Sequence, residues 1–248
     1  MEYFRYIIIF IFTPTSYNLY MKYKNTVNGI FLDRPNRFEA HVMIDDHVET
    51  VHVKNTGRCK ELLLPGVKVI LEKSMNPNRK TGYDLIAVFK ENLGWVNIDS
   101  QAPNQVVLEW LKTDNDIFTG LSLIKPEYKF GDSRVDFYLE KQEKKILMEV
   151  KGCTLEINGR GYFPDAPTQR GVKHLRELAG ALSQGFECYI AFVIAMNGIT
   201  SVQPNMDIHP EFGYALNEAK IAGVNVLYLC CDVTPDELRI AKGIRALN

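Results

Sequence analysis

The sequence predicts an α/β protein of two domains, an OB-like small β-barrel followed by a larger α/β domain with a mixed sheet. Residues 29–98 contain short β-type runs between turn signals, whereas beyond residue 101 strand-like runs alternate with helical patterns. A chain of 248 residues, 46% of them hydrophobic, is long enough for one or two domains. We place the boundary near residue 101, so that the domains span residues 21–101 and 102–248.

The first twenty residues, "MEYFRYIIIFIFTPTSYNLY", differ from the rest because they are aromatic, β-branched and almost uncharged. Their apolar run, Tyr6 to Phe12, is much shorter than the roughly twenty residues that span a bilayer. The segment also lacks the strongly basic start and the small-residue cleavage site of a signal peptide. Two interpretations stay open, an extension upstream of a start at Met21 or an edge strand. In neither case do we expect a membrane anchor.

Five β-type runs predict the barrel: "RFEAHVMI", "HVETVHVK", "GVKVILEK", "YDLIAVFK" and "GWVNI". Alternation in the second run places Glu49, Val51 and Val53 on one face and Val48 and Thr50 on the other. The intervening turns are rich in Asp, Asn, Gly and Pro, which favour tight turns. About five short strands in some seventy residues fit an OB-like barrel, a fold that hosts many functions.

Beyond the boundary the sequence predicts helices and strands in alternation. A helix begins at Pro103 or Asn104 in "QAPNQVVLEWLKT", and "SRVDFYLEKQEKKILMEVKGCT" is typical of a β-hairpin. A second helix, "TQRGVKHLRELAGALSQG", ends at Gly185, and a third follows in "PEFGYALNEAKIAG". A buried strand follows each of these two helices: "CYIAFVIAM" follows the second helix and "VNVLYLCC" follows the third. This order predicts an α/β layer with a mixed sheet.

A last helix is expected to open in "TPDELRIAK" near the C-terminus. Thr234 and Glu237 have the spacing of a capping box, in which each side chain satisfies a free backbone amide of the first helical turn. The sequence therefore predicts that the chain closes with a helix.

Charge and cysteine content restrict the function and the compartment. The net charge of −1 argues against a strongly basic nucleic-acid binder, although residues 21–101 are slightly basic and residues 102–248 slightly acidic. The five cysteines include no CxxC pair and leave an odd count, which fits a reducing cytosol better than a disulfide framework or a zinc site. We therefore expect a cytoplasmic protein.

The hairpin carries acids inside its apolar runs. Glu149 and Lys151 project from the same face of one strand, and the neighbouring antiparallel strand can place Asp136 beside them. Two adjacent carboxylates repel, and their burial is costly unless a cation or a proton lies between them. Mg²⁺ or Mn²⁺ would suit such a pair, because these ions take oxygen ligands. The lysine could then orient a water molecule or stabilise charge on a phosphate.

This pattern, an Asp, a gap of about a dozen residues and Glu-x-Lys, resembles the core motif of the PD-(D/E)xK nuclease superfamily. Val135 stands before Asp136, where the motif's name has proline, and the literal pair Pro164 and Asp165 follows the lysine and cannot be the first element. The competing interpretation is an ordinary cross-strand ion pair on a solvated face.

A basic helix and a third acid would complete such a site. In "TQRGVKHLREL" the side chains on one face are Arg170, Lys173, His174 and Glu177, and this face could hold phosphate. His174 could act as an acid or base, contact phosphate or a carboxylate, or have no role. Glu109 is the preferred third metal ligand and Glu127 the alternative, with ordinary surface charge as the competing interpretation for each.

Several motifs in the right order extend the resemblance to a family. "NRFEAHV", "VHVKNTGRCKELLLPG", "APNQVV", "SRVDF", "EVKGCTL" and "GYFPDAPTQRGVKHLREL" together resemble the sugar fermentation stimulation protein A family, over about residues 29–229. The resemblance implies an OB-like domain joined to a PD-(D/E)xK nuclease-like domain. It also implies DNA binding and a link to the regulation of sugar, notably maltose, utilisation.

The resemblance implies phosphate contacts on the barrel. The basic residues concerned are Arg37, Lys54, Arg58, Arg79 and Lys80. Asn55, Thr56 and Gly57 belong to the family's NTGR turn, whose amides could also meet an anion. No recognition helix is evident, so we expect non-specific, salt-dependent binding to the DNA backbone.

Two functions are consistent with the sequence. The first is a DNA-binding protein with a Mg²⁺-dependent nuclease-type site, and the alternative is a non-enzymatic DNA-binding transcriptional regulator that keeps the nuclease scaffold. A sugar-metabolising enzyme has little support, because the sequence carries no phosphate-loop or sugar-site signature.

Overall fold

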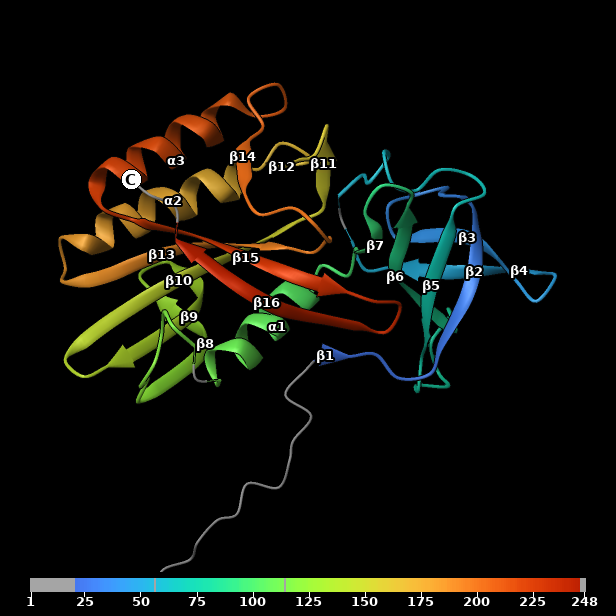
Figure 1. Ribbon diagram of the computed structural model, residues 1–248, viewed down its shortest axis with the longest axis horizontal. Coiled ribbons are helices and arrows are strands. Elements are labelled where there is room, and N and C mark those ends of the chain that lie inside the picture. Colours follow the sequence, from blue (N-terminus) through green and yellow to red (C-terminus); the bar gives the residue numbers. More distant parts are fainter. Residues whose placement is uncertain (1–20, 56, 114, 246–248) are drawn as a thin grey trace, which may run out of the picture.

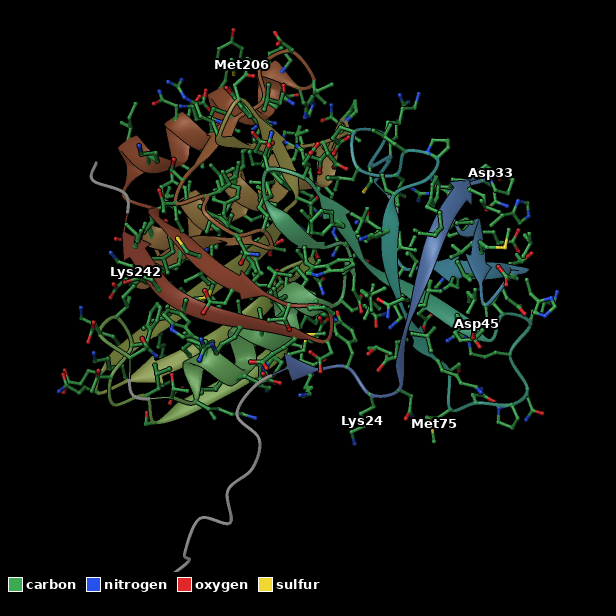
Figure 2. All side chains as sticks on the ribbon, turned by 45° about the vertical axis from the view of Figure 1, so that its right-hand side comes forward. Lys24, Asp33, Asp45, Met75, Met206 and Lys242 are labelled. Atoms are coloured by element: carbon green, nitrogen blue, oxygen red, sulfur yellow. The ribbon has the colours of Figure 1, made fainter. Side chains whose placement is uncertain are left out.

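The computed structural model describes residues 21–55, 57–113 and 115–245 and shows two side-by-side regions, an all-β region and an α/β region (Figure 1). The predicted N-terminal extension, residues 1–20, and Thr56 of the NTGR turn lie outside the described residues. In the rotated view, Asp33 and Asp45 lie on the all-β region and Met206 and Lys242 on the α/β region (Figure 2).

The all-β region is a closed barrel, which confirms the predicted OB-like fold. Its strands are β2 (Thr26–Asp33), β3 (Glu39–Ile44), β4 (His47–Val53), β5 (Lys68–Lys73), β6 (Tyr83–Lys90) and β7 (Gly94–Asn97). They lie in the order β4-β3-β2-β5-β6-β7, and a parallel pairing of β4 with β6 closes the barrel. Strand β2 was not among the predicted runs. The interior is apolar, with Val42, Val51, Leu71 and Leu85 fully buried.

The α/β region contains the predicted mixed sheet. Its strands are β1 (Met21–Lys22), β8 (Leu123–Phe130), β9 (Ser133–Lys141), β10 (Lys144–Cys153), β13 (Phe186–Ile194), β15 (Asn225–Val233) and β16 (Glu237–Arg245). Strands β10, β13 and β15 are parallel and the flanking pairs antiparallel, in the order β1-β16-β15-β13-β10-β9-β8. Strand β1 lies in the range assigned to the barrel domain, yet it pairs with β16 of this sheet.

In the described part of the chain, three helices cover the two faces of this sheet (Figure 1). Helix α1 (Ala102–Leu111) packs on one face, and helices α2 (Gln169–Leu182) and α3 (Pro210–Ala222) pack on the other. All three confirm predicted helices, although α2 ends three residues before Gly185, which adopts a positive φ of 84° in the following turn. A small sheet of β11 (Leu155–Ile157), β12 (Arg160–Phe163) and β14 (Val202–Pro204) borders the barrel.

The predicted last helix is wrong, because this segment forms strand β16. The amide of Thr234 donates to the carbonyl of Glu237, which closes a tight turn, and the chain then pairs antiparallel with β15. Leu238 and Ile240 are buried at a spacing of two, as a strand requires. The spacing of a capping box therefore coincides here with a β-turn, and sheet pairing decides the conformation.

Backbone contacts join the two regions directly. The amide of Asn97 donates to the carbonyl of Ala195 over 2.9 Å, and Val96 pairs with Met196 as an isolated bridge. These contacts connect β7 to the chain that leaves β13, so the barrel is attached beside the end of the central sheet. None of the helices in the described part of the chain is long and apolar enough to cross a membrane.

Candidate active site at the fork between β9 and β10

The site forms where two paired strands separate. The antiparallel register of β9 and β10 runs to the pair of Phe137 and Met148. Beyond this pair, the side chain of Asp136 on β9 accepts a hydrogen bond from the backbone of β10. The Asp136 carboxylate accepts the amide of Val150 over 2.7 Å and the side-chain amide of Asn104, at the start of α1, over 2.8 Å. Asp136 is thereby held in the fork by one partner from β10 and one from α1.

Glu149 lies next to this fork on the face that α2 covers, and only 2% of it is exposed. Its Oε1 accepts hydrogen bonds from the ammonium group of Lys151 and from Nδ1 of His174. Its Oε2 is buried and has no hydrogen-bond partner among the described residues. The carboxylate is therefore anchored through one oxygen, and the other is available to a ligand.

The two acids respond differently to their surroundings. Burial raises the pKa of Asp136, and the negative charge of Glu149 raises it further. Burial would also raise the pKa of Glu149, but His174 and Lys151 more than offset this and hold it below its ordinary value. The charge of Glu149 therefore acts on Asp136, which is consistent with the neighbouring positions that the hairpin predicts.

Helix α2 supplies His174 and a basic surface. His174 is buried, not on the polar face where its spacing placed it, and its Nε2 accepts a hydrogen bond from Nε of Arg170 over 3.2 Å. Arg170 and Lys173 are exposed at the mouth of a cavity of about 380 Å³. The other residues that line it are Lys129, Asp132, Ser133, Arg134 and His174. We call this basic cavity the α2 surface.

Neither predicted third acid joins the pair. Glu109 faces away, toward β16, and accepts a hydrogen bond from Gln105, whereas Glu127 forms an exposed ion pair with Arg134. Across the described residues, no three His, Cys, Asp or Glu side chains gather closely enough to hold a metal ion. The α1 residue that reaches the fork is Asn104, which the sequence indicated only as a possible helix start and not as a site residue.

Two of the basic barrel residues are engaged in internal ion pairs. Arg79 donates to both oxygens of Asp84, over 2.7 and 2.8 Å, and Lys54 lies 3.4 Å from Asp84 and 3.3 Å from Asp99. Asp84 and Asp99 are buried. Lys54 and Arg79 therefore stabilise the barrel, while Lys80 remains an exposed lysine.

The NTGR turn is built around an arginine that the sequence reasoning missed. The guanidinium group of Arg34 donates to the carbonyl oxygens of Arg37, Asn55, Gly57 and Arg58. The side-chain oxygen of Asn55 accepts the amide of Gly57 over 2.7 Å, so Asn55 shapes the turn from within. Three of these four partners lie more than twenty residues further along the chain, so local sequence carried no signal for this role of Arg34.

The turn also presents a basic cavity to solvent. Arg37, Arg58 and Lys60 are exposed around a space of about 410 Å³ that Ala166 also lines. We call this the barrel surface. Because helix α2 begins at Gln169, three residues after Ala166, the barrel surface and the α2 surface are joined by one short segment of chain.

An OB-like barrel attached to a mixed-sheet α/β domain, with Asp136, Glu149 and Lys151 at a strand fork, defines a two-domain protein. Residues 32–98 match the family model described as the SfsA N-terminal OB domain, and residues 101–237 match the sugar fermentation stimulation protein RE domain. The chain belongs to the sugar fermentation stimulation protein family.

Relatives of known sequence or structure agree with this membership. The sugar fermentation stimulation protein homolog of Ruminiclostridium cellulolyticum is 52% identical over 224 residues, covering 90% of this chain and 98% of the relative. The homolog of Desulfitobacterium hafniense is 53% identical over 218 residues, covering 88% and 94%. The solved structure of Pyrococcus furiosus SfsA in complex with Ca²⁺ has a TM-score of 0.82 and 26% identity, covering 90% of this chain and 96% of that one.

Proposed function

We propose that this protein binds DNA and hydrolyses phosphodiester bonds at the fork in a reaction that needs a divalent metal ion. The observation that carries the proposal is the buried Oε2 of Glu149, which lacks a hydrogen-bond partner among the described residues while Asp136 lies beside it. An unsatisfied buried carboxylate oxygen is costly. A cation between the two acids would remove that cost and reduce their repulsion.

The donor set fits Mg²⁺ or Mn²⁺, because these hard ions need only one or two carboxylates from the protein. Asp136 and Glu149 would hold the ion, and the related Pyrococcus furiosus protein was solved in complex with Ca²⁺, another hard divalent ion. When bound, the ion would stabilise the negative charge that develops on the phosphate. Asn104 and the Val150 amide keep Asp136 oriented for this role.

The remaining side chains suit hydrolysis of a phosphodiester. Lys151, with 14% of its side chain exposed, can place the attacking water and stabilise charge on phosphate. The water oxygen bonds to phosphorus as the bond to one bridging oxygen breaks. One water proton ends on the leaving oxygen and the other passes to solvent. His174 is a positioning residue, because it links Glu149 to Arg170.

Two basic surfaces offer a path for the nucleic-acid backbone. The α2 surface presents Arg170 and Lys173 beside the fork, and the barrel surface presents Arg37 and Arg58. Phosphates bound along both would give salt-dependent contacts without base reading. An effect on sugar utilisation, notably of maltose, would then be exerted through DNA.

The test is cleavage by the purified full chain. Single- and double-stranded DNA and RNA are incubated with Mg²⁺, Mn²⁺ or chelator, and Glu149→Gln is compared with Glu127→Gln, which alters an exposed acid outside the fork. We expect cleavage that requires the metal and falls at least about 100-fold in Glu149→Gln only. If no substrate on the panel is cut in either metal, the nuclease proposal fails.

A non-enzymatic DNA-binding regulator is the second candidate. It is favoured by the bonds from Lys151 and His174 to Glu149, because these donors partly compensate the carboxylate without a metal. In that case Glu149→Gln binds DNA as the unaltered protein does, and neither protein cleaves it. Loss of DNA binding at low salt in the unaltered protein would contradict both candidates.

A further inference from the structure

A polar cavity of about 140 Å³ lies between the two domains, next to the fork. The barrel contributes Asn55, Asp99 and Ser100, and the α/β domain contributes Thr154 and Asp165. Two more lining residues, Asn104 and Val150, are the hydrogen-bond donors to Asp136. The cavity therefore borders the two residues that hold the proposed metal-binding acid.

The lining chemistry differs from that of the two basic surfaces. Of the described residues that line the cavity, none is Lys, Arg or His, and two are acids, Asp99 and Asp165. An anionic phosphate would be repelled there, whereas a neutral polar ring could accept and donate hydrogen bonds. Ile98, Pro103 and Ala195 add apolar wall against which a flat ring can pack.

Several polar groups of the lining already have internal partners. Asn55 is bonded to Ile98 and Gly57, Asn97 is bonded to Tyr23, and Ser100 donates to the carbonyl of Lys54. Within the described residues, the Thr154 hydroxyl and the side-chain oxygen of Asn104 have no such partner. The Thr154 hydroxyl, which can donate and accept, and the Asn104 side-chain oxygen, which can accept, therefore remain available to a ligand.

Two glycines let the walls of the cavity come together. A Cβ on Gly57 would lie 2.2 Å from Oδ2 of Asp165, and a Cβ on Gly152 would lie 2.8 Å from Cγ of Pro103. The first contact brings the barrel against the α/β domain, and the second brings β10 against helix α1 within the α/β domain. The volume corresponds to about five water molecules at roughly 30 Å³ each. It suits one ring system and is too small for a base pair.

We propose that this cavity takes a single unstacked nucleobase of the strand whose phosphate lies at Asp136 and Glu149. This inference rests on the proposed function and narrows its substrate class to nucleic acid with unpaired nucleotides, either single-stranded or locally unpaired in a duplex. The phosphates run along the basic surfaces, and the base turns away from them into the polar cavity between the domains, which no Lys, Arg or His among the described residues lines.

Binding is tested without cleavage, in chelator, so that the result does not depend on the reaction. Three labelled duplexes are compared by fluorescence anisotropy: one fully paired, one with a single unpaired nucleotide, and one with an abasic sugar at that nucleotide. We expect the unpaired base to bind about tenfold more tightly than the other two. Equal affinity for the unpaired and abasic duplexes would overturn the proposal.

Variants of Thr154 locate the base. Thr154→Val removes the hydroxyl at nearly constant volume and is expected to reduce the preference about threefold to tenfold, the effect of one hydrogen bond. Thr154→Phe fills the cavity and is expected to abolish the preference, with thermal unfolding as the check on folding. Thr200→Val, an exposed threonine elsewhere, is the matched control and should change nothing. A preference that survives both Thr154 variants contradicts the assignment.

Cleavage assays separate this inference from the proposed function. Metal-dependent cutting with no preference for the unpaired nucleotide overturns the base cavity alone. A binding preference with no cutting in Mg²⁺ or Mn²⁺ overturns the nuclease proposal and supports the cavity as the base site of a binding protein.

Discussion

Two clusters of charged side chains lie within this protein, one in the barrel and one at the fork, and they differ in how completely their charges are matched. In the barrel, Asp84 accepts two hydrogen bonds from Arg79 and one from His52 and lies 3.4 Å from Lys54. At the fork, Asp136 and Glu149 repel each other, and one Glu149 oxygen has no partner among the described residues. A matched cluster stabilises the fold, whereas an unmatched one is prepared for a ligand.

The pKa shifts of the two aspartates express the same contrast. Burial would raise the pKa of Asp84, but Arg79, His52 and Lys54 outweigh it and lower the pKa to about 2. At Asp136, burial and Glu149 both act upward, and the pKa is raised. The barrel therefore stabilises the Asp84 carboxylate in the charged form, whereas the fork does not do so for Asp136 without a cation.

The largest expected effect is on cleavage. Asp136→Asn keeps the shape of the side chain and removes its charge, so we expect cleavage to fall by a factor of about 100 to 1,000. The change relieves the repulsion with Glu149, but it also replaces one accepting oxygen by an NH2 group that faces a donor, so the two effects oppose each other and thermal stability should change little. Initial rates and thermal unfolding of the same preparation measure both. Cleavage by the variant at the rate of the unaltered protein would show that Asp136 has no role in the site.

The corresponding change in the barrel should act on stability instead. Asp84→Asn leaves Arg79 and Lys54 without their shared carboxylate, and we expect the free energy of unfolding to fall by about 2 kcal/mol. Urea unfolding at neutral pH measures this, and cleavage per folded molecule should be unchanged. Asp33→Asn, at an exposed position of the barrel, is the control and should have little effect. Equal stability of Asp84→Asn would contradict the assignment of a structural role.

The pH dependence of stability follows from the lowered pKa of Asp84. Its folded-state pKa of about 2 lies below the ordinary value of 3.8, so its contribution is complete above about pH 5 and is lost as pH falls toward 2. The loss amounts to about 2 kcal/mol. Urea unfolding of the unaltered protein and Asp84→Asn between pH 6 and pH 2 measures it. The difference between the two should shrink across that window, and a constant difference would contradict the pairing.

A smaller effect is expected where the two regions touch. Gly57→Ala places a Cβ against the Asp165 carboxylate, and we expect a loss of about 1 kcal/mol together with weaker binding of unpaired nucleotides, because the cavity wall moves. Gly82→Ala is the matched control, since no atom lies within 4 Å of its added Cβ. Thermal unfolding and anisotropy provide the two measurements. Identical behaviour of the two variants would show that the Gly57 contact is unimportant.

The smallest expected effect separates binding from folding within the barrel. Arg58→Gln should weaken DNA binding and reduce the magnitude of the salt slope by about 1, without loss of stability, because Arg58 is exposed. Arg79→Gln should lower the free energy of unfolding and leave the salt slope of DNA binding unchanged, because the charge of Arg79 is paired with Asp84. Titrations of DNA at several salt concentrations, with urea unfolding alongside, measure both. A salt slope reduced equally in both variants would remove the distinction.

Local sequence patterns predicted much of the fold and the centre of the candidate site. The alternation of the barrel strands, the helices around Pro103 and Pro210, and the hairpin that carries Asp136, Glu149 and Lys151 depend on neighbours close in the chain. The antiparallel register also follows from the hairpin itself, so the proximity of its two acids could be inferred. The domain boundary near residue 101 and the assignment of Mg²⁺ remain predictions.

The wrong or missing parts depend on partners far apart in sequence. The segment after Thr234 became a strand because β15 was available to pair with it. The contact of His174 with a carboxylate was one expected alternative, but the residue was expected on a polar face and is instead buried against Glu149, 25 residues earlier. Spacing along a single helix cannot reveal which of its faces meets an acid on the sheet.

Residue types and short-range periodicity alone determined that the chain is a two-domain α/β protein with two acids and a lysine on one hairpin. Only the tertiary structure decided which charges are compensated: it assigned Lys54 and Arg79 to Asp84, brought Asn104 to Asp136, and left Oε2 of Glu149 buried without a partner among the described residues. The physical reason is that the cost of a buried charge depends on the atoms around it, and folding brings those atoms from distant parts of the chain.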